Sequence, residues 1–310
     1  MSPGKIVIAG GSGFLGQAVA DHLSDLGYEI VILSRSASGS KYKNVQWDGK
    51  SQGAWSSELD GAEAVINFSG ANIAKAWTPK YQQVLASSRI EPTDAIGKTI
   101  SDSVNPPKLW INGSAIGYYG DSGDQSLSEA SASGEGFMGE LCVKWERAQE
   151  EWVTPKTRKI AIRTGVVLSP DGGALQQLSK ITKAFLGGHV GSGEQYMSWI
   201  HLEDYCRIVE WMLKTDIHGP INATAPNPAT NKEFMSELRK ALGRPPIAPP
   251  APEAVFKLAC SVMGLEPTVI LQGQRVFPIA AQANGFRFLY PDLDEALDNL
   301  LDDAPDAWRK

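Results

Sequence analysis

Residues 5–16 decide the fold, and they read Lys-Ile-Val-Ile-Ala-Gly-Gly-Ser-Gly-Phe-Leu-Gly. The apolar run 6–9 is typical of a strand that is buried in a parallel sheet. Glycines after such a strand allow a tight turn, let backbone N–H groups approach a pyrophosphate, and let the next helix pack closely on the strand. We therefore predict a dinucleotide site, the alternative being a purely structural turn. The expected cofactor contacts here are Gly10, Gly11, Ser12, Gly13, Phe14, Leu15 and Gly16.

The first half of the chain alternates apolar runs with amphipathic stretches, as the βαβ crossovers of a parallel sheet require. Strands are predicted near residues 5–10, 29–34, 44–47, 63–68, 108–113 and 159–168. Helices are predicted over 14–26, about 79–103 and about 137–153. The predicted class is α/β: a Rossmann-type, doubly wound parallel sheet with a smaller, mainly helical C-terminal substrate subdomain.

After residue 168 this alternation loosens, which predicts a discontinuous division into two domains. We assign 1–168 plus 199–224 to a nucleotide-binding domain, and 169–198 plus 225–310 to a substrate subdomain. Four glycines in 187–195 indicate a loop, either mobile or covering a pocket. An apolar helix is predicted near 253–263, after two proline pairs.

The second predicted strand ends in Ser34-Arg35-Ser36, where an NAD-specific site places an acidic residue on the adenosine ribose. A guanidinium between two serines suits a 2′-phosphate instead, because Arg offers paired donors to phosphate oxygens. The sequence therefore predicts NADP(H) rather than NAD(H), with Ser34, Arg35 and Ser36 as cofactor contacts. The alternative is a solvated surface arginine.

Composition excludes several classes of protein. Lys and Arg number 29 against 35 Asp and Glu, a net charge of -6, which argues against a nucleic-acid-binding surface. No apolar run approaches the roughly 18 residues of a membrane span, and we expect no leader segment. Three widely spaced cysteines predict a reducing compartment and a cytoplasmic location. Four histidines without ligand spacing predict no metal site.

Several motifs together resemble the extended short-chain dehydrogenase/reductases, the group that includes nucleotide-sugar epimerases. Besides the glycine turn, these motifs are Asn67-Phe68-Ser69-Gly70-Ala71, the segment 113–121, and Trp199-Ile200-His201-Leu202-Glu203-Asp204. The resemblance implies that the cofactor is also contacted by Asn67, Ser69, Gly70 and Ala71.

Four further segments resemble an atypical subgroup of that family, the "epimerase family proteins", which have a characteristic C-terminal helical region. These segments are 117–121, 163–168, 193–195 and 285–291. The resemblance to this subgroup implies a fold and a cofactor, but it does not imply a particular reaction.

Ordinary members of the family use a Tyr-x-x-x-Lys pair for proton transfer, and this sequence lacks that pair. Depending on the register, its two positions hold Glu140 and Lys144 or Met138 and Cys142. The candidate catalytic residues are therefore Ser114, Tyr118, Tyr119 and Lys144. Cys142 is expected to be core packing. The candidate substrate contacts are Gln195, Trp199, His201 and Arg275.

These observations favour an NADP(H)-dependent oxidoreductase of the extended type, acting on a carbonyl or alcohol of an unidentified small-molecule substrate. The alternative is an NADP(H)-binding sensor without turnover. Sugar-nucleotide epimerisation is the weaker enzymatic hypothesis, because it needs the same hydride step without the usual tyrosine. The sequence indicates no nucleic-acid or membrane partner and leaves the oligomeric state open.

Overall fold

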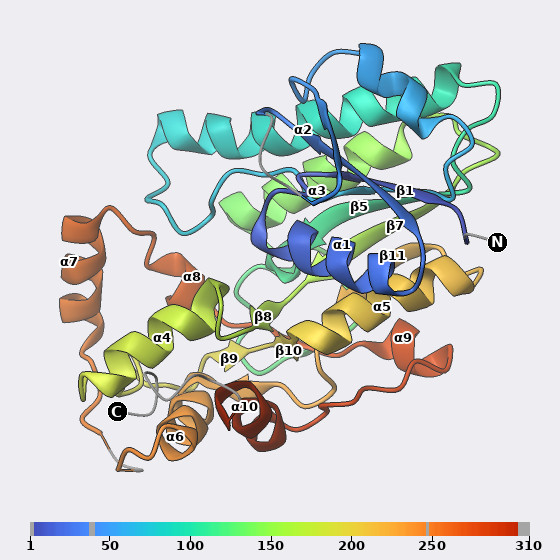
Figure 1. Ribbon diagram of the computed structural model, residues 1–310. Coiled ribbons are helices and arrows are strands. Elements are labelled where there is room, and N and C mark those ends of the chain that lie inside the picture. Colours follow the sequence, from blue (N-terminus) through green and yellow to red (C-terminus); the bar gives the residue numbers. More distant parts are fainter. Residues whose placement is uncertain (1–2, 37–40, 246–247, 303–310) are drawn as a thin grey trace.

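Seven parallel strands form the central sheet of the computed structural model, which describes residues 3–36, 41–245 and 248–302 (Figure 1). Their order across the sheet is β11-β7-β5-β4-β1-β2-β3. The strands are β1 (Lys5–Ala9), β2 (Glu29–Ser34), β3 (Lys43–Gln46), β4 (Ala64–Asn67), β5 (Leu109–Ala115), β7 (Arg158–Thr164) and β11 (Gly219–Ala223). The predicted α/β class and doubly wound parallel sheet are confirmed.

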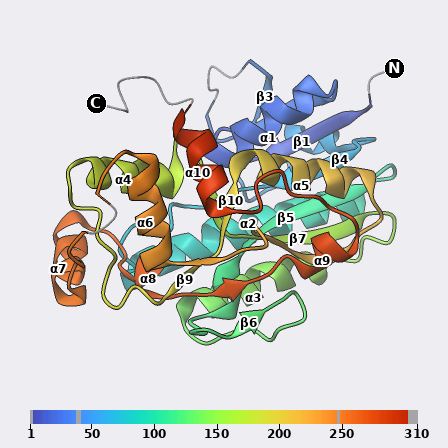
Figure 2. The ribbon, with the colours of Figure 1, turned by 90° about the horizontal axis from the view of Figure 1, so that it is seen from below.

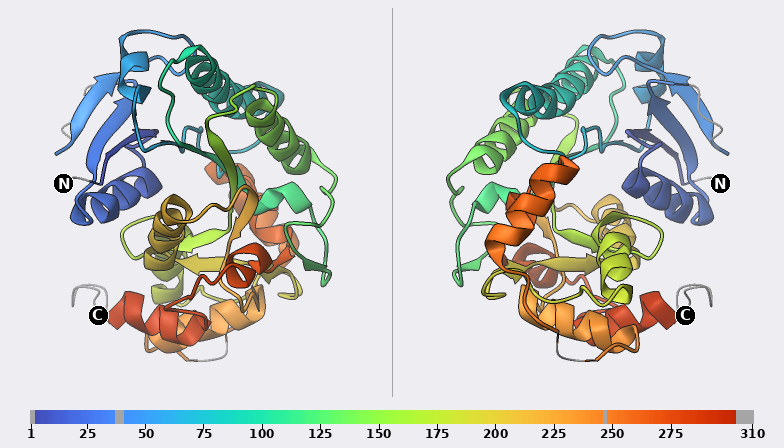
Figure 3. Two further views of the ribbon diagram at one scale, coloured as in Figure 1. Left: turned by 90° about the vertical axis from the view of Figure 1, so that its right-hand side faces the viewer. Right: turned by 90° about the vertical axis from the view of Figure 1, so that its left-hand side faces the viewer.

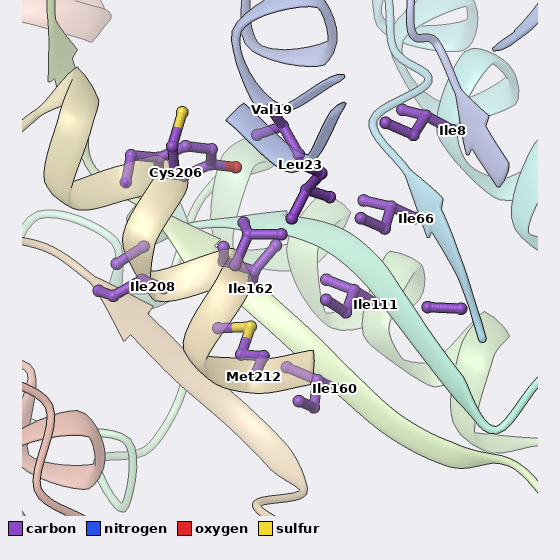
Figure 4. Close-up of a cluster of buried hydrophobic side chains, with 14 of the residues drawn as sticks. Ile8, Val19, Leu23, Ile66, Ile111, Ile160, Ile162, Cys206, Ile208 and Met212 are labelled. Carbon is purple, nitrogen blue, oxygen red and sulfur yellow. The ribbon is translucent and has the colours of Figure 1, made fainter. Parts of the chain in front are cut away.

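Helices cover both faces of the sheet, which is why its strands are apolar on both sides. Figure 3 shows α1 (Phe14–Asp25) and α5 (Leu202–Lys214) on one side, and α2 (Pro79–Asp102) and α3 (Phe137–Glu150) on the other. Side chains alternate between these two faces along β1. Ile6 and Ile8 join the core under α1 and α5, part of which is drawn in Figure 4. Val7 joins the core under α2.

The remaining strands and α-helices lie beyond the main sheet or along its β11 edge (Figure 2). The short strand pairs are β8 (Val166–Leu168) with β10 (Trp199–His201), β9 (Tyr196–Met197) with β12 (Ala229–Thr230), and β6 (Ser126–Leu127) with β13 (Arg275–Val276). The helices are α4 (Gly173–Lys183), α6 (Asn231–Ala241), α7 (Glu253–Met263), α8 (Thr268–Leu271), α9 (Ile279–Ala283) and α10 (Leu293–Asp302), of which α9 packs on the main core beside β11. Helices α4, α6 and α10 share a separate hydrophobic core with β8, β9, β10 and β12. Over the described ranges, no helix combines the length and apolar character needed to cross a bilayer. The division into two domains stays a prediction.

One predicted strand is wrong: residues 159–168 are not continuous. β7 ends at Thr164, and β8 begins at Val166 and pairs with β10 outside the main sheet. Gly165 marks the break, because a Cβ there would lie 2.5 Å from the carbonyl oxygen of Ser198. The backbone therefore passes too close to its neighbour for any other residue. The third predicted helix also ends earlier than expected, at Glu150 rather than residue 153.

The glycine turn joins β1 to α1 by a very close approach of backbone to backbone. Gly10 has a φ of 73°, and its N–H donates to the carbonyl of Leu33 at 3.2 Å, which ties the turn to β2. A Cβ at Gly16 would lie 2.6 Å from both the carbonyl oxygen of Gly10 and the Cα of Gly11. Gly16 therefore lets α1 begin directly against the end of β1.

We expect Gly16→Ala to lower the free energy of unfolding by about 1–3 kcal/mol, because the added methyl has backbone rather than a movable side chain in its way. Urea unfolding followed by circular dichroism measures this loss. Gly13→Ala is the matched control, since a Cβ at Gly13 meets nothing nearer than the Gly10 carbonyl oxygen at 3.3 Å. Equal losses in the two variants would contradict the packing role of Gly16.

Candidate active site

A hollow of about 490 Å³ lies at the carboxyl end of β1, where the crossovers run in opposite directions to β2 and to β4. Open α/β sheets bind ligands at this switch point. The glycine turn, the end of β2 and the loop after β4 form the walls of the hollow. The predicted cofactor residues that line it are Gly10, Ser12, Gly13, Ser34, Arg35, Ser69, Gly70 and Ala71.

The other predicted cofactor residues lie behind or beside this hollow. Gly11 and Gly16 pack inside the turn, where added Cβ atoms would collide with Ile32 and with the turn's own backbone. Phe14 and Leu15 line a second pocket, described below. Asn67 is fully buried and supports the loop after β4, since its Oδ1 accepts from Ser69 N at 3.1 Å. Ser36 is exposed and lies outside the lining of the hollow.

Charged side chains gather at the end of the hollow that is formed by β2 and the segment after β3. Arg35 is exposed and lines the hollow, and within the described ranges no carboxylate pairs with it. Lys50 lines the same hollow and is held by Glu91 Oε2 at 3.0 Å. Asp48 accepts hydrogen bonds from the backbone N–H groups of Ser51 and Lys50, and these bonds lower the pKa of its carboxyl. Asp48 and Lys50 are not among the residues predicted from the sequence.

The second pocket has a volume of about 470 Å³ and lies beyond the carboxyl ends of β5 and β7. Phe68 lines both this pocket and the first hollow, so the two adjoin. Its walls are mainly apolar and include Phe14, Leu15, Trp77, Met138 and Trp145. Its polar lining residues are Arg89, Ser114, Thr164, Tyr205, Thr268, Gln272 and Gln274. An apolar pocket next to a dinucleotide hollow can hold a small substrate against the cofactor.

Ser114 connects this pocket to a buried network of hydrogen bonds and charge. Its hydroxyl donates to Glu146 Oε1 at 2.6 Å. Arg163 binds the same carboxylate with two donors, Nε to Oε1 and Nη2 to Oε2, both at 2.8 Å. Nη1 of Arg163 donates to the hydroxyl of Tyr119 at 2.9 Å, and that hydroxyl donates to Asn222 Oδ1 at 2.7 Å. The five side chains form one network running away from the pocket.

Burial and charge shift the pKa values of two side chains in this network, Arg163 and Tyr119. Burial disfavours the charged form of Arg163, but the bonds to Glu146 outweigh that effect and raise the pKa of the guanidinium. Burial also raises the pKa of Tyr119, although Arg163 opposes it. Tyr119 therefore stays a neutral phenol at physiological pH.

Of the four candidate catalytic residues, the structure brings Ser114 to the pocket. Neither Tyr118 nor Tyr119 is part of the pocket lining. The guanidinium of Arg163 stacks 3.5 Å above the ring centroid of Tyr118, and Tyr119 is buried in the network. Lys144 is exposed on α3, with its Nζ 3.7 Å from Glu140 Oε2.

The two possible registers of the missing Tyr-x-x-x-Lys pair point to opposite faces of α3. Glu140 and Lys144 face solvent, whereas Met138 lines the pocket and Cys142 is fully buried. Burial raises the pKa of the Cys142 thiol to about 12, which makes it unreactive. The pocket-facing register therefore holds a thioether and a neutral thiol where the family has a phenol and an ammonium.

The four candidate substrate contacts all lie outside the lining of the second pocket. Trp199 is fully buried and donates to the carbonyl of Asn227, and His201 caps α5 and stacks on Tyr290. Gln195 donates to the carbonyl of Val190. Arg275 lies over the ring of Tyr196. Part of the glycine-rich segment 187–195 lines a separate hollow of about 560 Å³.

The polar residues of the pocket other than Ser114 were missed from the sequence. Arg89 had a detectable signal, because it shares the buried face of α2 with Leu85 and Ile96, and a charge on an apolar helix face is unusual. Gln272 and Gln274 follow α8 and reach the pocket through the tertiary fold, so no local pattern points to them. No cluster of three or more His, Cys, Asp or Glu that could hold a metal occurs in the part of the chain that the structure describes.

The sheet order and the glycine turn define a Rossmann-type dinucleotide-binding fold. Comparison with protein families agrees: residues 6–223 match the NAD dependent epimerase/dehydratase family, and residues 251–300 match a domain of unknown function, DUF1731. The chain belongs to the NAD dependent epimerase/dehydratase family.

Two similar proteins are the epimerase family protein YfhF of Bacillus subtilis and the human epimerase family protein SDR39U1. They are 37% and 33% identical to this chain over 96% of its length and 98% and 99% of their own. A crystal structure of human SDR39U1 (isoform 2) with NADPH superposes with a TM-score of 0.87 at 32% identity, covering 96% of this chain and 99% of the other. A nucleoside-diphosphate sugar epimerase from Corynebacterium glutamicum has a TM-score of 0.79 at 30% identity, over 97% of this chain and 58% of its own.

We expect Glu146→Ala to lower the free energy of unfolding by about 3–5 kcal/mol, because it leaves the buried Arg163 guanidinium without its counter-charge. Urea unfolding at neutral pH gives the loss. Glu140→Ala, on the exposed face of the same helix, is the control and should cost less than about 1 kcal/mol. A Glu146→Ala variant as stable as the control would contradict the network as a structural unit.

Proposed function

We propose that this protein is an NADP(H)-dependent oxidoreductase that transfers a hydride between the nicotinamide and a carbonyl or alcohol carbon of a small, largely apolar molecule. The observation that carries this proposal is the pair of adjoining cavities at the switch point. One has the glycine turn and charged rim of a dinucleotide hollow, and the other is an apolar pocket with Ser114 in its wall. Three buried free thiols support a reducing, cytoplasmic location.

The residues of the first hollow fit a phosphorylated dinucleotide. Gly13 lines the hollow and precedes α1, whose N-terminus has no side-chain cap among the described residues, so its first N–H groups suit a diphosphate. Arg35 lies at the rim without an acidic partner in the described ranges, which suits a 2′-phosphate. The human relative, 32% identical over nearly its whole length, has been crystallised with NADPH.

When bound, the nicotinamide supplies or accepts the hydride, and the residues of this chain position the substrate and hold the proton. Apolar walls formed by Phe14, Trp77 and Trp145 exclude water from the pocket. Ser114 Oγ points its hydrogen at Glu146, so its lone pairs are free to accept a hydrogen bond from a substrate hydroxyl. For oxidation, that hydroxyl proton moves to Ser114 Oγ while the Ser114 proton moves to Glu146. Reduction reverses both transfers.

A second function, an NADP(H)-binding sensor without turnover, has its own supporting observation. Glu146 is bound by two donors of Arg163 and is the counter-charge of that buried guanidinium, so its carboxylate is already engaged in the fold. No tyrosine–lysine pair takes over the task, since Lys144 is at the surface. Sugar-nucleotide epimerisation remains the weaker enzymatic alternative for the same reason.

Arg35→Asp tests the choice of cofactor. We expect the Kd for NADPH to rise about tenfold to a hundredfold, the worth of charge-assisted hydrogen bonds to one phosphate, with little change for NADH. Fluorescence titration of the two reduced cofactors measures both constants. An unchanged NADPH affinity would make Arg35 a solvated surface residue and refute its assignment.

Ser114→Ala tests the proton path. We expect turnover of a carbonyl compound to fall by about 10²–10⁴-fold with unchanged NADPH affinity, because a positioned proton-transfer group contributes on that scale. Loss of the absorbance of reduced nicotinamide across a panel of aldehydes and ketones gives the rates. Ser179→Ala, which removes a buried hydroxyl outside the pocket, is the control. Tight NADPH binding with no turnover by the unaltered protein would favour the sensor.

A further inference from the structure

Arg89 is a buried positive charge in the wall of the apolar pocket. It lies on α2 with 9% of its surface exposed. Its Nη1 donates to the carbonyl oxygen of Leu85 at 3.0 Å, and its Nη2 donates to that of Ala71 at 3.1 Å. The guanidinium also lies 5.1 Å from the ring centroid of Trp145. These contacts fix its position without neutralising its charge.

No carboxylate pairs with Arg89 within the described part of the chain. The other deeply buried guanidinium beside this pocket, that of Arg163, has Glu146 as its counter-charge. Burial lowers the pKa of Arg89, in keeping with a charge that has lost water and gained no acidic partner. An arginine nevertheless remains protonated at physiological pH. Burying an unpaired charge is costly, which indicates that its partner is a ligand.

Resting on the proposed function, we infer that Arg89 binds an anionic group of the substrate, and that the substrate class is an apolar carboxylic acid carrying the reacting carbonyl or alcohol. The apolar walls would contact the body of such a molecule, with its carboxylate on Arg89 and its reacting oxygen on Ser114. A low-dielectric pocket strengthens the attraction between guanidinium and carboxylate. Gln272 and Gln274, from the segment after α8, add neutral amide groups to the same pocket.

The anion on Arg89 has two possible sources, the substrate and the diphosphate of the cofactor. The cavities favour the substrate. Arg89 lines the apolar pocket, whereas the turn residues expected to bind a diphosphate, Gly10, Ser12 and Gly13, line the adjoining hollow. Gly70 lines the hollow and packs against Arg89, since a Cβ at Gly70 would be 3.2 Å from Cζ of Arg89. Gly70 therefore lies between Arg89 and the hollow.

The test compares two probes of the same shape and different charge, 3-phenylpropionate and 3-phenylpropionamide, titrated calorimetrically into the full chain loaded with NADP⁺. The carboxylate should bind the unaltered protein about tenfold to a hundredfold more tightly than the amide. Arg89→Met should abolish this preference, and Arg89→Lys should keep part of it. Lys98→Met, which removes an exposed charge from the same helix, should leave it intact.

Several results would overturn the inference. One is that the unaltered protein binds the two probes equally or binds neither. Another is that the preference for the carboxylate survives in Arg89→Met. A third is that Arg89→Met loses much of its NADPH affinity while the ratio of the two probe affinities is unchanged. The last would assign Arg89 to the cofactor's diphosphate. If Arg89→Met does not fold, the probe ratio of Arg89→Lys decides. Failure of the unaltered protein to bind NADPH would overturn the proposed function, and the probe ratio is then measured on the cofactor-free chain.

Discussion

The close contact between the start of α1 and the end of β1 determines where the two cavities of the molecule lie. At Gly16 the two backbones approach so closely that a single methyl group would collide with the turn. This closeness directs the N-terminus of α1 at the space between β1 and β4, where the sheet order reverses. Both cavities open from that space, one toward the end of β2 and the other toward the ends of β5 and β7.

The buried ion pair of Glu146 and Arg163 is the main chemical feature that separates this site from a tyrosine–lysine site. The Glu146 carboxylate of this pair lies directly behind Ser114, with Oε1 at 2.6 Å from the hydroxyl oxygen. The serine therefore presents an acceptor to the pocket rather than a donor. In the proposed reaction, this acceptor would receive the proton of an alcohol substrate, and it would return that proton when a carbonyl is reduced. The unpaired Arg89 supplies the opposite charge elsewhere in the same pocket.

Much of the fold and part of the site could be predicted from the sequence because their signals are local. The glycine turn, the apolar strands and Ser34-Arg35 depend on neighbouring residues, and the structure places them around one hollow. The pocket is different, since its polar groups come from α2, β5, β7, α5, α8 and the segment after α8. Tyr119 and Lys144 looked plausible as catalytic residues in the sequence. Burial in a network and exposure on a helix face, neither visible in a motif, set them apart from the pocket.

The most direct test of the account follows the hydride itself. The full chain is incubated with NADPH deuterated on one face of the nicotinamide C4 and with an aromatic aldehyde acid, and the alcohol product is analysed by mass spectrometry. The account predicts that deuterium from one face, and not from the other, appears on the carbinol carbon. NADPH that binds tightly but yields no labelled alcohol from any aldehyde or ketone tested would contradict it.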